Sequence, residues 1–148
     1  MDFIFDKDVL QDMQTIISLY KKFDRYKDNT RESLYYHILP SIKLKQYKIH
    51  KDKDGNVIAF TNWAFLDKEA EEQFIKTASI EDDKWNSGNK AWHIDTVCVK
   101  DIKKVMAWTK NYFKKILKVG EGLNWLRVDN NDNIYRKSIK FKREFHNG

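Results

Sequence analysis

The spacing of the apolar residues alternates between a helical and a strand-like period, and this alternation constrains the fold more than any other feature of the chain. Residues 8–23 place seven apolar side chains three or four positions apart, which predicts an amphipathic helix within the N-terminal segment 1–29. A second helix is predicted over residues 31–46, with Thr30 as its N-cap. Pro40 lies inside that segment, so a kink or a break is expected there.

Beyond residue 46 the period shortens to two. The segments 46–51 and 57–63 flank a turn in which Gly55 supplies a positive φ, which is typical of a β-hairpin. The remaining expected elements are a short helix at 68–77, a central strand at 91–99, a helix at 101–118, and two strands, 123–129 and from 134 onward, joined by a turn at 130–133. This order predicts the α/β (α+β) class, a mixed sheet flanked by helices in one domain over 1–148.

Composition narrows the class of protein. The chain has 148 residues with 28 Lys and Arg against 22 Asp and Glu, and no apolar run approaches the roughly 20 residues that span a bilayer. Acidic residues at the N-terminus argue against a signal peptide, and the single Cys98 cannot form an internal disulfide, so a cytoplasmic protein is expected. Basic residues gather in 134–148, which suits either a solvated edge strand or a docking surface for an acidic partner. No nucleic-acid-binding motif accompanies them.

Histidines and acids in apolar surroundings are the candidates for chemistry. His93 and Asp95 are two positions apart on the predicted central strand and so point to the same face, as a base and its orienting carboxylate could. Their Cα atoms would lie about 6.5–7 Å apart, which is poor for a close dyad. The alternative is a structural carboxylate beside a satisfied sheet histidine. His37 lies on the second helix, whereas His50 and His146 are expected at the surface. No ligand spacing supports a metal site.

The tryptophans have two interpretations. Trp63 ends a strand and Trp92 opens one, so either could line a binding cleft or fill the core. Trp85 lies in a loop beside Ser87 and Gly88, where a tryptophan more often faces a ligand or a partner.

Two blocks of the sequence carry a family resemblance. The stronger block is Trp85-Asn86-Ser87-Gly88-Asn89, Trp92 and Ile94-Asp95, followed by 126–129, and the weaker one comprises 39–42, 46–47, 57–60 and 62–64. In order and spacing, residues 30–130 resemble the toxin-activating lysine acyltransferases. The resemblance implies an acetyltransferase-like fold, transfer of a fatty acyl group from acyl carrier protein to internal lysines of a pore-forming toxin, and a histidine–aspartate pair in the active site.

The aspartate of that pair corresponds to Asp95. The histidine should stand fourteen residues before Pro40, where this chain has Tyr26, and His37 stands where the family usually has asparagine. The base is therefore predicted to be His37 first, His93 second and Tyr26 third, since an unperturbed phenol titrates near 10. Other residues of the matched blocks are expected to bind substrate: Asn62, Trp63, Trp85, Trp92 and Arg127.

In its short length and its missing histidine, the chain is also similar to the short homologues encoded with siderophore-microcins. That resemblance implies a subunit of a maturation enzyme that attaches a glucosylated catecholate siderophore to the C-terminal carboxylate of a microcin peptide. It would act with a second maturation subunit on a peptide toxin precursor, as a homodimer within the complex. No tightly bound cofactor is expected, but a carboxylate needs activation, most simply by ATP and Mg²⁺. The alternatives are a lysine fatty acyltransferase that activates a pore-forming toxin, or a non-catalytic scaffold subunit.

Overall fold

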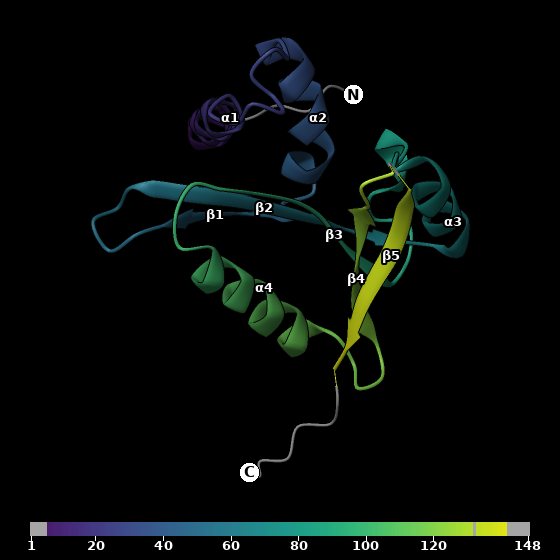
Figure 1. The fold of residues 1–148 in the computed structure, drawn as a ribbon. Coiled ribbons are helices and arrows are strands. Elements are labelled where there is room, and N and C mark those ends of the chain that lie inside the picture. Colours follow the sequence, from purple (N-terminus) through teal and green to yellow (C-terminus); the bar gives the residue numbers. More distant parts are fainter. Residues whose placement is uncertain (1–5, 132, 142–148) are drawn as a thin grey trace, which may run out of the picture. The chain divides into compact units, whose positions relative to one another are not determined.

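The computed structural model describes residues 6–131 and 133–141. Helices and strands alternate along them (Figure 1), which confirms the predicted mixed α/β class. The elements in chain order are α1 (Lys7–Tyr20), α2 (Arg31–Lys43), β1 (Tyr47–Lys51), β2 (Val57–Leu66), α3 (Lys68–Thr77), a 3₁₀ turn (Asp82–Lys84), β3 (Lys90–Cys98), α4 (Ile102–Ile116), β4 (Gly122–Val128) and β5 (Ile134–Lys140).

The five strands follow one another in the sheet in the order β1-β2-β3-β4-β5. β1 and β2 are antiparallel, with Tyr47 opposite Asn62. β3 and β4 are parallel, with Ala91 opposite Leu123. β4 and β5 are antiparallel again. The sheet is therefore mixed, and β5 forms one edge of it, as the lysine-rich sequence of that strand predicts.

The chain divides into two compact units, and β2 and β3 run through both. The first contains the described residues up to Trp63 together with Asp95–Ile102. Within it α1 and α2 lie side by side (Figure 1) and bury their apolar faces against β2 and β3. The buried core of this unit is formed by Met13, Ile16, Ile17, Leu19, Tyr20, Leu34, Ile38, Ile42, Phe60 and Val97.

The second unit contains Ala64–Ile94 and the described residues from Lys103 onward. Its core joins the end of β2 to α3 and β3 through Ala64, Leu66, Ala70, Phe74, Trp85 and Trp92. The backbone after Trp85 is bound tightly to β2, because the N–H groups of Ser87 and Gly88 both donate to the carbonyl oxygen of Phe65, at 2.8 and 3.1 Å.

The second helix differs from its prediction at the C-terminal end. α2 does not break at Pro40 but continues three residues past it, and it ends at Lys43 rather than 46. A kink at Pro40, the alternative to a break, stays a prediction. Near a helix C-terminus proline removes a single hydrogen bond, which the buried apolar face outweighs. The helix stops because Lys45 takes a positive φ of 56°, and the N–H of Gln46 then donates to the carbonyl oxygen of Ser41.

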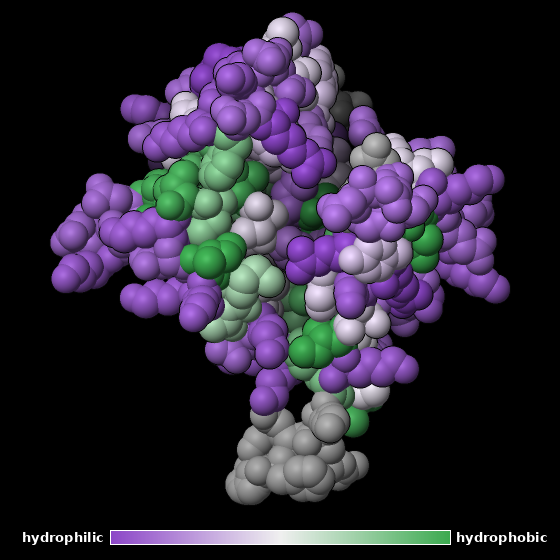
Figure 2. All heavy atoms as spheres, in the orientation of Figure 1, coloured by the Kyte–Doolittle hydropathy of each residue, from purple (hydrophilic) through white to green (hydrophobic). Residues whose placement is uncertain are grey.

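Some predictions concern residues outside those described. Residues 1–5 of the predicted N-terminal helical segment and the end of the basic C-terminal segment, including His146, are among them. In the described part of the chain, no helix combines the length and the apolar character that crossing a bilayer demands. The outward surface of α1 and α2 is mostly hydrophilic in Figure 2.

Candidate functional site

A single carboxylate oxygen, Oδ2 of Asp95 on β3, joins side chains from two helices of the first unit. It lies 2.7 Å from Nε2 of His37 on α2. It also accepts a hydrogen bond of 2.6 Å from the hydroxyl of Tyr20, the last residue of α1. The structure thus brings together His37 and Asp95, the pair ranked first from the sequence.

The backbone of Asp95 is held by a buried amide. Oδ1 of Asn62 accepts from the N–H of Asp95 at 2.9 Å, and Nδ2 of Asn62 donates to Oγ of Ser41 at 3.0 Å. Ser41 follows His37 by one turn of α2, so the hydrogen bonds form a closed ring that runs from α2 through β2 and β3 and back to α2. This ring fixes the imidazole relative to the carboxylate.

The electrostatics favour a charged pair. The hydrogen bond to Asp95 raises the pKa of His37 above its usual 6.5, and the negative charge of Asp95 adds to this, whereas partial burial and Arg25 oppose it. The side chain of His37 is 42% exposed and that of Asp95 is 19% exposed. The imidazole is therefore open to a substrate while the carboxylate behind it is shielded.

Tyr26 lies beside this pair. Its ring centre is 6.3 Å from that of His37 and 4.8 Å from that of Tyr20, edge to face. Burial and the nearby Asp95 carboxylate raise the pKa of the Tyr26 phenol, with Arg25 opposing. The raised pKa favours the protonated phenol, which can donate a hydrogen bond. The role of Tyr26, ranked third as a base, stays a prediction.

His93, the second-ranked base, is half-buried on β3 two residues before Asp95, and its role stays a prediction. Arg127, a predicted substrate-binding residue, is exposed on β4, opposite Tyr135 of β5.

The other predicted substrate-binding residues lie in the interior. Asn62 and Trp92 are fully buried, Trp63 is 3% exposed, and Trp85 is 6% exposed. The expectation of an outward-facing Trp85 is therefore wrong, because its ring packs in the core of the second unit. Trp92 donates from Nε1 to Oε2 of Glu71 at 2.7 Å. In this structure these side chains support the fold, and their contact with a substrate stays a prediction.

Two side chains have partners that the sequence alone does not identify. Tyr20 is one of the apolar positions that predict the first helix, and the polar tip of a tyrosine in such a stripe is a signal for a buried partner. His50 was expected at the surface but is 7% exposed, with Nε2 2.9 Å from Oγ1 of Thr61.

The geometry of the pair is that of a general base and its orienting carboxylate. With Asp95 ionised, Nε2 of His37 carries the hydrogen that faces the carboxylate, and the lone pair lies on Nδ1. Within residues 6–131 and 133–141, Nδ1 has no hydrogen-bond partner. A substrate N–H or O–H could therefore transfer its proton to Nδ1, while Asp95 stabilises the resulting imidazolium.

Among the described residues, no group of three or more His, Cys, Asp or Glu side chains could hold a metal ion.

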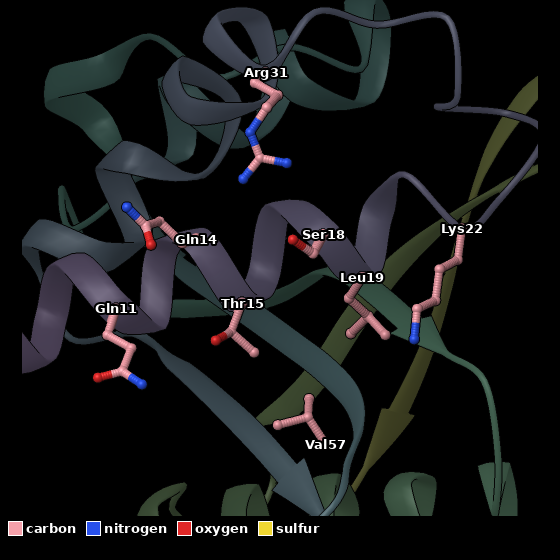
Figure 3. Close-up of a pocket in the computed structure, with 8 residues that line it drawn as sticks. All are labelled: Gln11, Gln14, Thr15, Ser18, Leu19, Lys22, Arg31 and Val57. Carbon is pink, nitrogen blue, oxygen red and sulfur yellow. The ribbon is translucent and has the colours of Figure 1, made fainter.

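A hollow of about 420 Å³ lies against α1 in the first unit, lined by Gln11, Gln14, Thr15, Ser18, Leu19, Lys22, Arg31 and Val57. Figure 3 shows Thr15 and Leu19 pointing toward Val57. None of the residues around Asp95 lines this hollow.

Comparison with known proteins gives the family. The family model described as RTX toxin acyltransferase matches residues 6–141. Similar curated proteins include the RTX-II toxin-activating lysine-acyltransferase ApxIIC of Actinobacillus pleuropneumoniae, which is 39% identical over 61 residues, 40% of this chain and 38% of that protein. The leukotoxin-activating lysine-acyltransferase LktC serotype A11 of Mannheimia haemolytica is 36% identical over 73 residues, 49% of this chain and 43% of that protein.

A third relative, the protein-lysine myristoyltransferase RtxC of Kingella kingae, is 34% identical over 61 residues, 40% of this chain and 36% of that protein. The chain thus spans about two fifths of the length of the curated relatives it matches. The family match, in contrast, extends over the described residues from the first to the last. The chain therefore belongs to the RTX toxin acyltransferase family.

Proposed function

We propose that the protein is a lysine acyltransferase that modifies a toxin precursor. The observation that carries the proposal is the 2.7 Å contact between His37 and Asp95 in a chain of this family. The family resemblance places a histidine at position 26, and the ring of Tyr26 lies 6.3 Å from that of His37. A histidine from α2 thus reaches the same neighbourhood, and the base is replaced rather than lost.

The proposed reaction uses an acyl thioester carried by acyl carrier protein. The neutral ε-amine of a lysine attacks the thioester carbonyl, so a C–N bond forms, and the amine passes a proton to Nδ1 of His37. The C–S bond then breaks, and the leaving thiolate takes that proton from His37, which returns the base to its neutral form. Asp95 stabilises the transient imidazolium, and the Tyr26 phenol can donate to the carbonyl oxygen as it gains charge.

The first test is acyl transfer by the purified protein. Acylated carrier protein and a lysine-containing toxin precursor are incubated with the protein, and the precursor is weighed by intact mass spectrometry. The expected product is heavier by one acyl group. His37→Ala and Asp95→Asn should each slow the transfer by about 10²–10⁴-fold, with circular dichroism showing that the variants fold. Tyr26→Phe should slow the transfer less than either of these substitutions.

The same assay separates the other interpretations. The siderophore-microcin reaction, first predicted from the sequence, would give an ester at the C-terminal carboxylate and would depend on ATP and Mg²⁺. Hydroxylamine cleaves such an ester but leaves an amide on lysine intact. A hydroxylamine-sensitive product would therefore refute lysine acylation in favour of ester formation. Full activity of Asp95→Asn in the presence of partner proteins would support a scaffold role.

A further inference from the structure

The second unit contains a polar hollow that the proposed acyl transfer does not use. It measures about 350 Å³ and is lined by Asn89, Lys90, Gly120, Glu121, Gly122, Asn124, Arg136, Ser138 and Lys140. We infer that this hollow binds the phosphate group of a small ligand or of a carrier's prosthetic arm. The inference goes beyond the proposed function, because no step of the transfer requires the site.

The register of β4 and β5 explains why these residues share one face. Gly122 lies opposite Lys140, and Asn124 lies opposite Ser138. Directly opposite residues of antiparallel strands point to the same side, as do alternate residues along one strand. Lys140, Ser138 and Arg136 therefore line one side of β5 and face the hollow with β4.

Gly122 makes the floor of the hollow. A Cβ atom there would lie 2.7 Å from the carbonyl oxygen of Ile139, which is too close for any side chain. Only glycine therefore fits at this position, where the backbone of β5 and the side chain of Lys140 lie close to the Cα atom. Farther along the same face, Leu126 packs in the core with α3 and does not line the hollow.

Arg136 is anchored at the edge of the hollow. Its Nε and Nη2 atoms donate to Oδ1 of Asn124 at 3.0 and 2.7 Å, and its guanidinium lies 5.4 Å from the ring centre of Trp92. Nη2 also lies 3.8 Å from Oε2 of Glu71. These contacts hold the guanidinium in place and leave its third nitrogen, Nη1, for a ligand. Because the side chain is already ordered, ligand binding costs it little conformational entropy.

The charge at the hollow suits a phosphate. Within the described residues, neither Lys90 nor Lys140 makes an ion pair. The acidic side chain in the lining, Glu121, accepts from the backbone N–H of Lys118 at 2.6 Å. Three cations together with the amide of Asn89 and the hydroxyl of Ser138 match a tetrahedral group with several acceptor oxygens better than a singly charged carboxylate.

The test titrates the full chain with inorganic pyrophosphate at low ionic strength by isothermal titration calorimetry. Lys90→Gln and Lys140→Gln should each weaken binding by roughly fivefold or more, and the double variant by more than about tenfold. Lys137→Gln is the matched control, since Lys137 is on the same strand and of the same charge but at an odd register position, on the opposite face. It should stay within about twofold of the parent.

Two results would overturn the inference. One is equal weakening by all three single substitutions, which would mean that pyrophosphate responds only to the net charge of +6. The other is no measurable binding by the parent at millimolar pyrophosphate. The readout is independent of acyl transfer, because His37→Ala should slow transfer by about 10²–10⁴-fold and leave pyrophosphate binding unchanged.

A second set of titrations identifies the source of the phosphate. Competition by ATP would point to a nucleotide. If holo acyl carrier protein binds more tightly than the apo form, and Lys140→Gln removes the difference, the ligand is the phosphodiester of the carrier's prosthetic group. This part of the test rests on the proposed function. Equal binding of both carrier forms without competition by pyrophosphate would overturn the phosphate site in favour of an acidic protein surface.

Discussion

At the scale of single residues, the behaviour of the site depends on how Oδ2 of Asp95 is shared. Tyr20 and His37 both bond to this oxygen, so each withdraws part of the charge that the other feels. The pKa of Tyr20 is raised well above its usual value, first by burial and then by Asp95. Tyr20 is therefore a permanent donor, and His37 is the partner that can lose and regain a proton near neutral pH.

The pH dependence of acyl transfer follows from this division. His37 acts as a base only when it is neutral, so the rate should rise with pH through a pKa above 6.5, because Asp95 raises that pKa. Asp95→Asn removes the negative charge and leaves at most a neutral acceptor, whereas burial and Arg25 still lower the pKa of His37. The residual activity of that variant should therefore rise at a lower pH. The rate profile from pH 5 to 9 checks this, and a profile that does not move would contradict the role of Asp95.

Tyr20→Phe tests the second bond to Asp95. The ring packing against His37 and Phe60 would remain, but the hydroxyl donor would be lost. Removal of a hydrogen bond to a partly buried charged group should cost about 1–3 kcal/mol in the free energy of unfolding. The carboxylate would then act more strongly on His37, so the rising limb of the rate profile should move to higher pH.

Tyr26→Phe is the matched control for that measurement. The hydroxyl of Tyr26 makes no hydrogen bond within the described residues, so the pH at which the transfer rate rises should not change. If Tyr20→Phe also leaves that pH unchanged, Tyr20 has only a packing role.

The sequence was sufficient to propose His37 and Asp95, because a histidine from a separate helix can meet a strand carboxylate end-on. It was insufficient for Tyr20, because helical periodicity counts a tyrosine as an apolar position and does not report where its hydroxyl points. Asn62 shows the same limit. Its position in a matched block predicts substrate binding, which stays a prediction, but does not show that Asn62 is fully buried and supports Asp95 through two hydrogen bonds.

At the scale of elements, the motif Trp85-x-Ser87-Gly88 is hydrogen-bonded to the junction between β2 and α3. The hydroxyl of Ser87 accepts from the backbone N–H of Asp67 at 3.0 Å, and Asp67 caps α3 by accepting from Ala70 N–H at 2.8 Å. The sequence indicated a loop here but could not show which backbone it contacts, because that partner lies about twenty residues away. Element types, in contrast, were predictable, and the helix at 68–77 has its predicted bounds.

Gly88→Ala tests this attachment. A Cβ at Gly88 would lie 2.5 Å from the carbonyl oxygen of Leu66 and 2.6 Å from the backbone of Asp67. The backbone would have to shift, at a cost of about 1–3 kcal/mol in the free energy of unfolding, measured by urea denaturation. Gly55→Ala is the control, since a Cβ there meets nothing within 4 Å and the substitution bears only the strain of a positive φ. A smaller loss for Gly88→Ala than for Gly55→Ala would contradict the proposed attachment.

At the scale of the whole molecule, two histidines make opposite contributions to stability. His37 has a raised pKa in the folded state, so the stability that it contributes is present below the pKa of the unfolded chain and is lost as the pH rises through the folded value. Burial, with a smaller effect of Lys48, lowers the pKa of His50 to about 4. Its contribution is present above about 6.5 and is lost as the pH falls toward 4.

His50→Gln should therefore flatten the loss of stability in mild acid. Glutamine cannot take up a proton, and its amide can still bond to Oγ1 of Thr61, which lies 2.9 Å from Nε2 of His50. Asp52 and Asp129 do not obscure this window. Hydrogen bonds from backbone and side-chain N–H groups within their own turns lower the pKa of both below 3.8, so their contributions are lost at more acidic pH.

Urea midpoints of the parent and of His50→Gln, measured at intervals from pH 7 to 4, should converge as the pH falls. His37→Gln is the control of opposite sign, because its midpoint should approach that of the parent as the pH rises above neutrality. Parallel curves for the parent and His50→Gln from pH 7 to 4 would mean that His50 takes up a proton as readily in the folded chain as in the unfolded one. Such a result would contradict its burial against Thr61.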